Sequence, residues 1–344
     1  MSGPFGAGAL QFFSGGAGDG FYPHTIDGCL FIDGNSTARL SRTAIAVDDT
    51  TKATWSFWWK RASGIYTNFS SEGEFFLQNT AGNNRGFRLR TNSSGEGTLS
   101  LYVNPSSGTS AFIITDREFR DQAGWVHVIW HWDSSNAVES ERVRLYVNGT
   151  RVTEFSQETY PPLNDAHDFN TGFGSWRVGS TSSYNATAGG KRAFRGYLTE
   201  FHFMDGYNYG PEYFGETKNG VWVPIEVTGV TYGTGGWYLP LTSNGNDASG
   251  NGNDFTEYNV GAHDYKTDSP TNNFCVLDAN NSYNFRLSEG NLKFTNTTTR
   301  WDGALATFAV PKTGKWYWEV YVNAGTNVVT GLANGSSNII NNRS

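Results

Sequence analysis

The sequence contains only two cysteines in 344 residues, which excludes a protein held together by a framework of disulfide bonds. Cys29 and Cys275 are far apart in the chain, and both are expected to be reduced, buried, small apolar residues. Charge is also scarce, because only 17% of the residues are charged. Low charge with many aromatic, β-branched and turn-forming residues is typical of an all-β protein built from many short strands.

Several functional classes lack the sequence features that they need. The formal net charge is −7 and no basic stripe is present, which argues against a protein that binds nucleic acid. No apolar run approaches the roughly 20 residues of a membrane span, so membrane insertion is not predicted. Residues 1–20 have no basic region before an apolar core, as a secretory signal would. We therefore expect a protein that stays in a cytosol or leaves it in an assembled particle.

The clearest structural signal lies in residues 124–152. Two runs that alternate in polarity are separated by a polar break, and the second run ends at Asn148 and Gly149. An Asn-Gly pair supplies the two positive φ angles that a type I′ turn requires. This stretch predicts three β-strands, the last two of them joined by a tight hairpin.

Short alternating runs continue on both sides of this stretch. In residues 54–60, Trp55, Phe57 and Trp59 share one face of a predicted strand, and mostly polar residues share the other. No segment has a helical period of useful length. About ten short strands at this spacing predict a sandwich or a jelly roll. Further strands are predicted at residues 29–32, 38–41, 75–78, 86–90, 99–103 and 111–115.

A set of segments, taken in order and spacing, resembles the laminin-G-like or concanavalin-A-like lectin and glucanase domains. The resemblance covers roughly residues 26–216 and implies a two-sheet jelly-roll sandwich. The segments that carry it are DGNSTARLSRT (33–43), TWSFWWKR (54–61), GWVHVIWHWD (124–133), RVRLYVNGTRV (142–152), and WRVGS (176–180) with FRGYLTEFHFMDG (194–206).

Later segments resemble parts of structural proteins from tailed, especially marine, bacteriophages. They are PEYFGETKNGVWVP (211–224), DASGNGNDFT (247–256) and TDSPTNNFC (267–275). This resemblance implies a virion component, in a tail fibre, a spike or a capsid decoration, that is assembled in the host cytoplasm. It also implies a homo-oligomer, with a trimer favoured, although the sequence contains no coiled-coil heptads that would enforce one.

The last part of the chain resembles the first half of a SPRY domain. Residues 291–333 contain its marker, GKWYWEV, and residues 315–322 alternate as a strand would. A SPRY sandwich needs more strands than follow before Ser344. We expect the natural protein to continue beyond this residue; otherwise these strands would complete a sheet with another chain. The expected fold class is therefore an all-β, concanavalin-A-like jelly-roll sandwich with a partial second, SPRY-like β-sandwich at the C-terminus.

These patterns divide the chain into four parts. Residues 1–25 are a Gly-rich stretch with scattered aromatics, either a flexible tail or an arm that orders on other virion proteins. Residues 26–216 form the jelly roll. Residues 217–275 are rich in Gly, Asn and Asp, and their aromatic residues predict a packed connector rather than a free linker. Residues 276–344 begin the SPRY-like sandwich.

One stretch of the connector raises the question of a calcium site. NGNDASGNGND (244–254) is rich in the oxygen ligands that Ca²⁺ prefers. It lacks the alternating acidic ligands and the closing glutamate of an EF-hand loop, and Asx turns explain its composition better. Calcium is therefore an unsupported alternative, and no cofactor is predicted.

The histidines do not form a zinc motif. His127 and His131 are four residues apart on a predicted strand, which separates them by about 13 Å. This separation is too large for the two side chains to share one zinc ion. We expect them to be packing or hydrogen-bonding residues.

The sequence also lacks a pair of catalytic carboxylates in a suitable strand. A retaining glucanase needs two carboxylates about 5 to 5.5 Å apart. The nearest pairs, Glu72 with Glu74 and Glu139 with Glu141, fall in Gly- or Ser-rich turns. No enzymatic activity is predicted, and a glycan hydrolase is the least favoured of the functions considered.

Carbohydrate binding is the activity that the sequence favours. Sugars are held by aromatic side chains that stack on their apolar faces and by polar groups that bond their hydroxyls. Core packing competes for the aromatic residues, because the chain has 12 Trp and 17 Tyr. We predict a virion structural protein that adheres to host surface glycans; the alternative is a purely architectural virion protein that makes oligomer or lattice contacts. The candidate glycan-binding residues are Trp176, Tyr184, Asn185, Tyr207, Asn208 and Tyr209.

Overall fold

The protein is all-β, as predicted. The described residues form β-strands joined by turns and short 3-10 helices, and no α-helix occurs among them. No helix in this part of the chain is long and apolar enough to cross a membrane. The computed structural model describes residues 20–332 except for 34–37, 44, 46, 63–73, 80–84, 91–96, 104–110, 168–174, 180–193, 279–284, 297–302, 311–312, 316 and 325–327.

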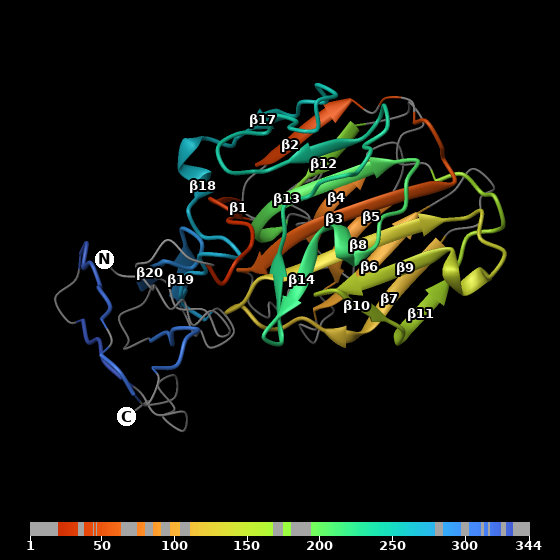
Figure 1. The fold of residues 1–344 in the computed structure, drawn as a ribbon. Helices are drawn as coiled ribbons and strands as arrows, with labels where there is room; N and C mark the ends of the chain where they lie inside the picture. Colours follow the sequence, from red (N-terminus) through yellow and green to blue (C-terminus); the bar gives the residue numbers. More distant parts are fainter. Residues whose placement is uncertain are drawn as a thin grey trace.

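Two eight-stranded antiparallel sheets pack face to face as a sandwich (Figure 1). The first sheet consists of β1 (Cys29–Asp33), β3 (Lys52–Arg61), β8 (Val126–Asp133), β9 (Val143–Val147), β10 (Thr150–Val152), β13 (Arg195–Asp205), β16 (Trp237–Leu239) and β18 (Tyr265–Lys266). Its order is β10-β9-β8-β3-β13-β1-β18, and β16 also pairs with β13.

The second sheet consists of β2 (Arg39–Thr43), β4 (Glu74–Asn79), β5 (Arg85–Arg90), β6 (Thr98–Val103), β7 (Ala111–Glu118), β11 (Phe155–Thr159), β12 (Ser175–Val178) and β17 (Thr256–Tyr258). Its order is β11-β7-β6-β5-β4-β12-β2-β17. Two hairpins lie outside the sheets: β14 (Gly215–Lys218) with β15 (Val221–Pro224), and β19 (Phe285–Ser288) with β20 (Lys293–Asn296). The 3-10 helices among the described residues are η1 (Glu139–Glu141), η3 (Pro211–Tyr213) and η4 (Ala262–Asp264).

Aromatic side chains fill the core between the two sheets. Trp55, Phe57 and Trp59 of β3 and Trp130 and Trp132 of β8 are each at most 1% exposed. The predicted inward face of β3 is therefore confirmed. Burial of such large side chains is the main favourable contribution to folding, at about 1.5 to 3 kcal/mol for each.

The hairpin between β9 and β10 has the predicted geometry. Asn148 has a φ of 48° and Gly149 a φ of 74°, and Thr150 pairs with Val147. Glycine is also required by the neighbouring side chain, because a Cβ at this position would lie 2.3 Å from the ring of Trp222. Trp222 of β15 therefore packs against this turn of the first sheet.

We expect Gly149→Ala to lower the free energy of unfolding by about 2 to 4 kcal/mol, because it adds a clash with Trp222 to backbone strain. Gly220→Ala is the matched control, since Gly220 has a φ of +80° and nothing within 4 Å of its would-be Cβ. The control should lose only about 1 to 2 kcal/mol. Urea unfolding followed by tryptophan fluorescence measures both. Equal losses would contradict a tight contact between Gly149 and Trp222.

The sandwich extends beyond residue 216. β16 joins the first sheet beside β13, β18 joins it beside β1, and β17 forms the edge of the second sheet beside β2. Residues 217–275 are therefore packed, and they supply strands to both sheets rather than linking two separate bodies. These strands are only two or three residues long, so no alternating pattern could reveal them.

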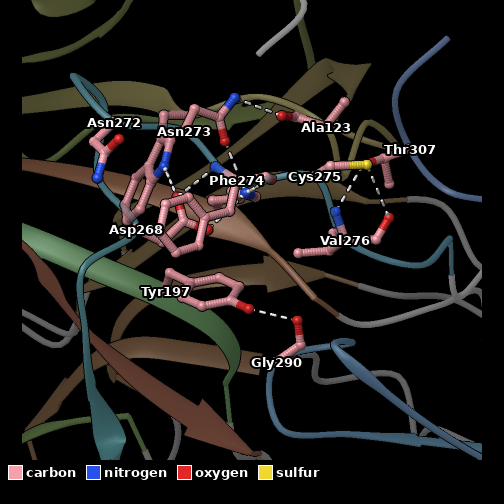
Figure 2. Close-up of polar contacts among 12 residues, drawn as sticks. Ala123, Tyr197, Asp268, Asn272, Asn273, Phe274, Cys275, Val276, Gly290 and Thr307 are labelled. Carbon is pink, nitrogen blue, oxygen red and sulfur yellow. Dashed lines mark hydrogen bonds and ion pairs between the residues drawn. The ribbon is translucent and has the colours of Figure 1, made fainter. Parts of the chain in front are cut away.

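Residues 267–278, here called the docked segment, are held against the sandwich by side-chain hydrogen bonds. Asn273 Nδ2 donates to the Ala123 carbonyl at 2.7 Å, as Figure 2 shows. The Val276 amide donates to Thr307 Oγ1 at 3.2 Å, which ties the docked segment to the chain that follows.

A buried ion pair fixes the centre of the docked segment. Lys60 Nζ projects from the outer face of the first sheet and contacts Asp268 Oδ2 at 2.8 Å, Asn273 Oδ1 at 2.7 Å and the Phe274 carbonyl at 2.6 Å. Trp125 Nε1 donates to the other carboxylate oxygen of Asp268 at 2.9 Å. The ammonium group thus has three acceptors, and its side chain is 0% exposed. These three acceptors compensate the charge of the ammonium group, which would otherwise be costly to bury.

Both cysteines are free thiols. Cys29 is buried, as predicted, and burial raises the pKa of its thiol well above the ordinary value. Cys275 is only partly buried, and its Sγ lies 3.9 Å from Thr307 Oγ1. The prediction of burial therefore holds for Cys29 and not for Cys275, whose side chain lies where the docked segment meets the following chain.

The predicted strand at residues 315–322 does not form. Residue 315 and residues 317–324 have no regular secondary structure, and Tyr321 is 88% exposed. A strand needs hydrogen bonds to a neighbour, and no strand in the described part of the chain pairs with this segment. The regular structure described after residue 276 is the β19–β20 hairpin and an isolated bridge between Leu277 and Ala306.

Candidate functional site

The predicted glycan-binding residues do not gather into one site. Trp176 is 1% exposed and packs against Phe203 and Trp237, so it is a core residue and not a surface for a sugar. The alternation of β12 directs its side chain inward. Tyr184 and Asn185 lie outside the described residues.

The other candidates lie on the loop that follows β13, where three tyrosines form a row that we call the tyrosine ladder. Tyr207 is 40% exposed, and its ring stacks on Tyr209 with 6.1 Å between the ring centroids and 22° between the planes. Tyr209 in turn meets Tyr213 of η3 edge to face at 4.9 Å. The ladder therefore presents one exposed ring that is supported from behind by two others.

Hydrogen bonds to the first sheet hold this loop in place. Thr54 Oγ1 donates to the Tyr207 carbonyl at 2.9 Å. The side-chain amide of Asn208, oriented with its nitrogen inward, donates to the carbonyls of Ala53 and Trp132 at 3.0 and 3.1 Å. Asn208 thus anchors the loop through its amide nitrogen, which is not available to bond a sugar hydroxyl. The tyrosine ladder is preorganised by these contacts.

A second polar cluster, which sequence patterns did not indicate, lies on the outer face of the first sheet. Ser56, His127, Glu200 and His202 line a small cavity of about 10 Å³ together with apolar side chains that include Phe214. This volume has room for no more than about one water molecule. Ser56, His127 and the Glu200–His202 pair come from three different strands, so no spacing in the sequence could have linked them.

The Ser56–His127 pair resembles the nucleophile and base of a hydrolase, but its hydrogen bonds run in the opposite direction. Trp222 Nε1 can only donate, and it lies 3.1 Å from His127 Nδ1, so this nitrogen accepts. Burial lowers the pKa of His127 to about 3, and the neutral ring carries its proton on Nε2. Nε2 therefore donates to Ser56 Oγ at 2.8 Å, whereas a general base would accept the serine proton there.

Glu200 and His202 complete the cluster through two tyrosines. Glu200 has a φ of 50° at an irregularity of β13, which turns its carboxylate away from the core. The carboxylate accepts from Tyr238 Oη at 2.8 and 2.9 Å, and His202 Nδ1 lies 2.8 Å from Tyr232 Oη. Burial and Glu200 raise the pKa of Tyr238, so its hydroxyl stays protonated. This network connects β13 to residues 232–238.

One of the two carboxylate pairs that come nearest to a catalytic spacing lies in η1, where Glu141 forms an exposed ion pair with Arg151. Glu141 accepts two hydrogen bonds from Arg151, at 2.7 and 2.8 Å, and these lower its pKa. A general acid needs the opposite shift. Glu139 lies beside it in the same turn. Of the other pair, Glu72 lies outside the described residues, and Glu74 begins β4.

The two strand histidines make separate hydrogen bonds, as the sequence predicts. His131 Nε2 donates to the Tyr209 carbonyl, below the tyrosine ladder, while His127 contacts Ser56 and Trp222. Burial lowers the pKa of His131 to about 4. Within the described ranges, no group of three or more His, Cys, Asp or Glu side chains is arranged to hold a metal ion.

The loop at residues 244–254 is ordered by its own hydrogen bonds. The Asp247 carboxylate accepts from the amides of Tyr238, Ser249 and Asn253, at 2.8 to 2.9 Å, and from the Ser249 hydroxyl at 2.9 Å. The contact from the Ser249 amide, two residues along the chain, is the Asx-type turn that the composition indicates, and the contact from the Tyr238 amide ties the loop to β16.

A family model described as the concanavalin A-like lectin/glucanases superfamily matches residues 33–207, just over half of the chain. The match begins at the end of β1 and ends at the first residue of the tyrosine ladder. No curated protein matches the sequence.

Solved structures with similar folds are distant in sequence. A pentraxin from Limulus polyphemus is 14% identical with a TM-score of 0.34, and the match covers 62% of this chain and 93% of that one. A Bacteroides ovatus protein described as carbohydrate binding is 13% identical with a TM-score of 0.36, over 67% of this chain and 57% of that one. The tailspike protein 2 enzymatically active domain of bacteriophage CBA120 is 14% identical with a TM-score of 0.33, over 57% and 31%. The chain thus spans less than two thirds of the latter two proteins.

Proposed function

Because this chain belongs to the concanavalin A-like lectin/glucanases superfamily, we propose that it is a glycan-binding structural protein of a bacteriophage virion. Its role is adhesion to host surface glycans from a tail fibre, a spike or a capsid decoration. The tyrosine ladder is the observation that carries this proposal. Tyr207 offers an exposed, supported aromatic ring on a fixed loop, and sugars stack their apolar faces on such rings.

The virion location is supported by the segments that resemble phage structural proteins. Residues 211–224 form η3 and the β14–β15 hairpin, residues 247–256 include the loop held by Asp247, and residues 267–275 lie in the docked segment. Each of the three segments therefore forms an ordered part of the folded chain. Under the proposal, residues 1–25 contact other virion proteins and the chain forms a homo-oligomer, a trimer in a fibre. Residues 276–344 would begin a SPRY-like module.

A purely architectural role in the virion is the second candidate. Large apolar side chains after residue 316 are exposed, with Tyr321 at 88%, Val329 at 82% and Leu332 at 70%. Exposed apolar patches mark contact surfaces, and oligomer or lattice contacts would cover this one. A hydrolase is less favoured, because Glu141 and the Ser56–His127 pair are engaged in other interactions.

The adhesion proposal is tested by binding of the full chain to an array of host surface polysaccharides. The full chain is needed because a fragment of residues 26–216 would lack β16, β17 and β18. We expect Tyr207→Ala to weaken binding about three- to tenfold, which is the contribution of one aromatic stacking contact. Tyr317→Ala is the matched control, since Tyr317 is 60% exposed and lies far along the chain from the ladder.

The outcomes separate the candidates. Binding that Tyr207→Ala weakens and Tyr317→Ala does not would support adhesion through the tyrosine ladder. Failure of the native chain to bind any host polysaccharide would count against adhesion and favour the architectural role. Release of sugar from a polysaccharide, abolished by a single carboxylate substitution, would instead restore the hydrolase.

A further inference from the structure

A second surface with binding chemistry lies on the outer face of the other sheet, where β17, β2 and β12 are neighbours. Arg39 of β2 lies directly opposite Tyr258 of β17, and Ser41 lies opposite Arg177 of β12. Residues that are opposite each other or two apart on a strand share a face. Arg39, Arg177 and Tyr258 therefore share one face, whereas Leu40 between them points into the core and is 0% exposed.

Arg177 is the residue that indicates a ligand. Its Nε is covered from solvent and has no hydrogen-bond partner among the described residues. Burial lowers the pKa of its guanidinium, and the positive charge of Arg39 lowers it further. The Arg177 side chain as a whole is only partly buried, so an anion can reach the guanidinium and supply acceptors and the opposite charge. The chain as a whole has a net charge of −7, so its composition gives no reason to expect Arg39 and Arg177 side by side.

Tyr258 adds an apolar surface next to the two arginines. Its side chain is 43% exposed. The Arg39 guanidinium lies 4.2 Å from the centroid of its ring, which orients the ring by a cation–π contact. An aromatic ring beside a planar cation is the combination that an acidic sugar requires, because such a sugar has both an apolar ring face and an anionic group.

We infer that Arg177, Arg39 and Tyr258 form a binding site for an acidic saccharide. The anionic group of the sugar accepts hydrogen bonds from Arg177, and the sugar ring lies against Tyr258. The planar guanidinium fits both a carboxylate, as in a uronic acid, and a sulfate ester. The inference depends on the proposed function only in taking the ligand to be a saccharide. It does not depend on the tyrosine ladder, which follows β13 of the opposite sheet.

Affinity electrophoresis of the full chain tests this site, with polygalacturonate, dextran sulfate or neutral dextran in the gel. We expect an anionic polymer to retard the native chain and neutral dextran to have no effect. Arg177→Gln should weaken the apparent affinity about tenfold or more, because a charge-assisted pair is lost. Arg177→Lys keeps the charge but loses the planar fork and should also weaken binding. Arg120→Gln is the matched control, since its side chain is 55% exposed and it follows β7.

Each result has a defined meaning. Preferential retardation by polygalacturonate would identify a carboxylate, and preferential retardation by dextran sulfate would identify a sulfate ester. No retardation of the native chain by either polymer would overturn the inference, as would equal losses for Arg177→Gln and Arg120→Gln. If host glycans on the array fail to bind while polygalacturonate binding depends on Arg177 and not on Tyr207, the adhesion proposal fails and the acidic-saccharide site stands.

Discussion

Lowering the pH from 7 to 4 is expected to unfold this protein, because three buried histidines must take up protons. His127, His131 and His167 are at most 3% exposed. Burial is the main reason that the pKa of His127 is lowered to about 3 and those of His131 and His167 to about 4. In the unfolded chain a histidine has a pKa of about 6.5.

The direction of the pH effect follows from these values. Between pH 6.5 and 4, the unfolded chain binds protons that the folded chain does not bind, so the free energy of unfolding falls as the pH falls. Each of the three histidines then contributes a loss of about 3 kcal/mol by pH 4. Two carboxyl groups act in the opposite direction, since burial raises the pKa of Asp205 and Asp268. They offset part of a loss that is comparable with the whole stability of a domain, about 5 to 15 kcal/mol.

Urea unfolding at pH 7, 6, 5 and 4, followed by tryptophan fluorescence, measures this dependence. His131→Gln should flatten it between pH 6.5 and 4, because glutamine does not titrate and can still donate to the Tyr209 carbonyl. His263→Gln is the control, since the His263 side chain is 80% exposed, and it should leave the slope unchanged. A free energy of unfolding that stays constant from pH 7 to pH 4 would contradict the prediction.

The sandwich could be predicted where one face of a strand is apolar and the other polar. The β3 strand and the Asn148-Gly149 hairpin were predicted because their signals are local. The burial of the polar face of β3 could not be predicted in this way. Phe214 and Pro224 lie beside Ser56, and Asp268 lies on Lys60, so the cover comes from chain more than 100 residues away. Alternation carries no information about what lies over a face.

Two features of the site could have been predicted from the alternation of apolar and polar residues. In β13, Leu198 points into the core, and so do Phe201 and Phe203. In a regular strand, residues that point to the same side are an even number of positions apart, but Leu198 and Phe201 are three apart. The strand must therefore be irregular between them, where Glu200 lies. In β12, Trp176 has the same phase as buried Val178, which indicates that it belongs to the core and not to a loop.

The strand predicted at residues 315–322 does not form, although its sequence alternates. One alternating set of its side chains is fully apolar, and the other mixes Lys315 and Glu319 with the aromatic residues Tyr317 and Tyr321, so both faces carry large apolar surface. Such a run needs cover on both faces and hydrogen bonds at both edges. The local pattern cannot supply these partners, and the segment is exposed.

Lys60→Met is expected to lower the free energy of unfolding by about 3 to 5 kcal/mol, because it leaves one member of a buried ion pair without its partner. Lys60 lies 2.8 Å from Asp268, and both side chains are at most 2% exposed. Burial already raises the pKa of Asp268, and Lys60 is the largest influence that lowers it. Without the ammonium group, the carboxylate must either stay charged in the interior or take up a proton, and both cost free energy.

The double variant Lys60→Met/Asp268→Asn separates a lost attraction from an uncompensated charge. It should recover a large part of the stability, because a neutral amide can still accept from Trp125 and carries no charge to desolvate. Arg151→Met is the control for an exposed pair and should cost less than about 1 kcal/mol. If the two substitutions in the double variant add, with no recovery, the ion pair does not hold the docked segment, and the cost of Lys60→Met arises from lost hydrogen bonds to Asn273 and Phe274.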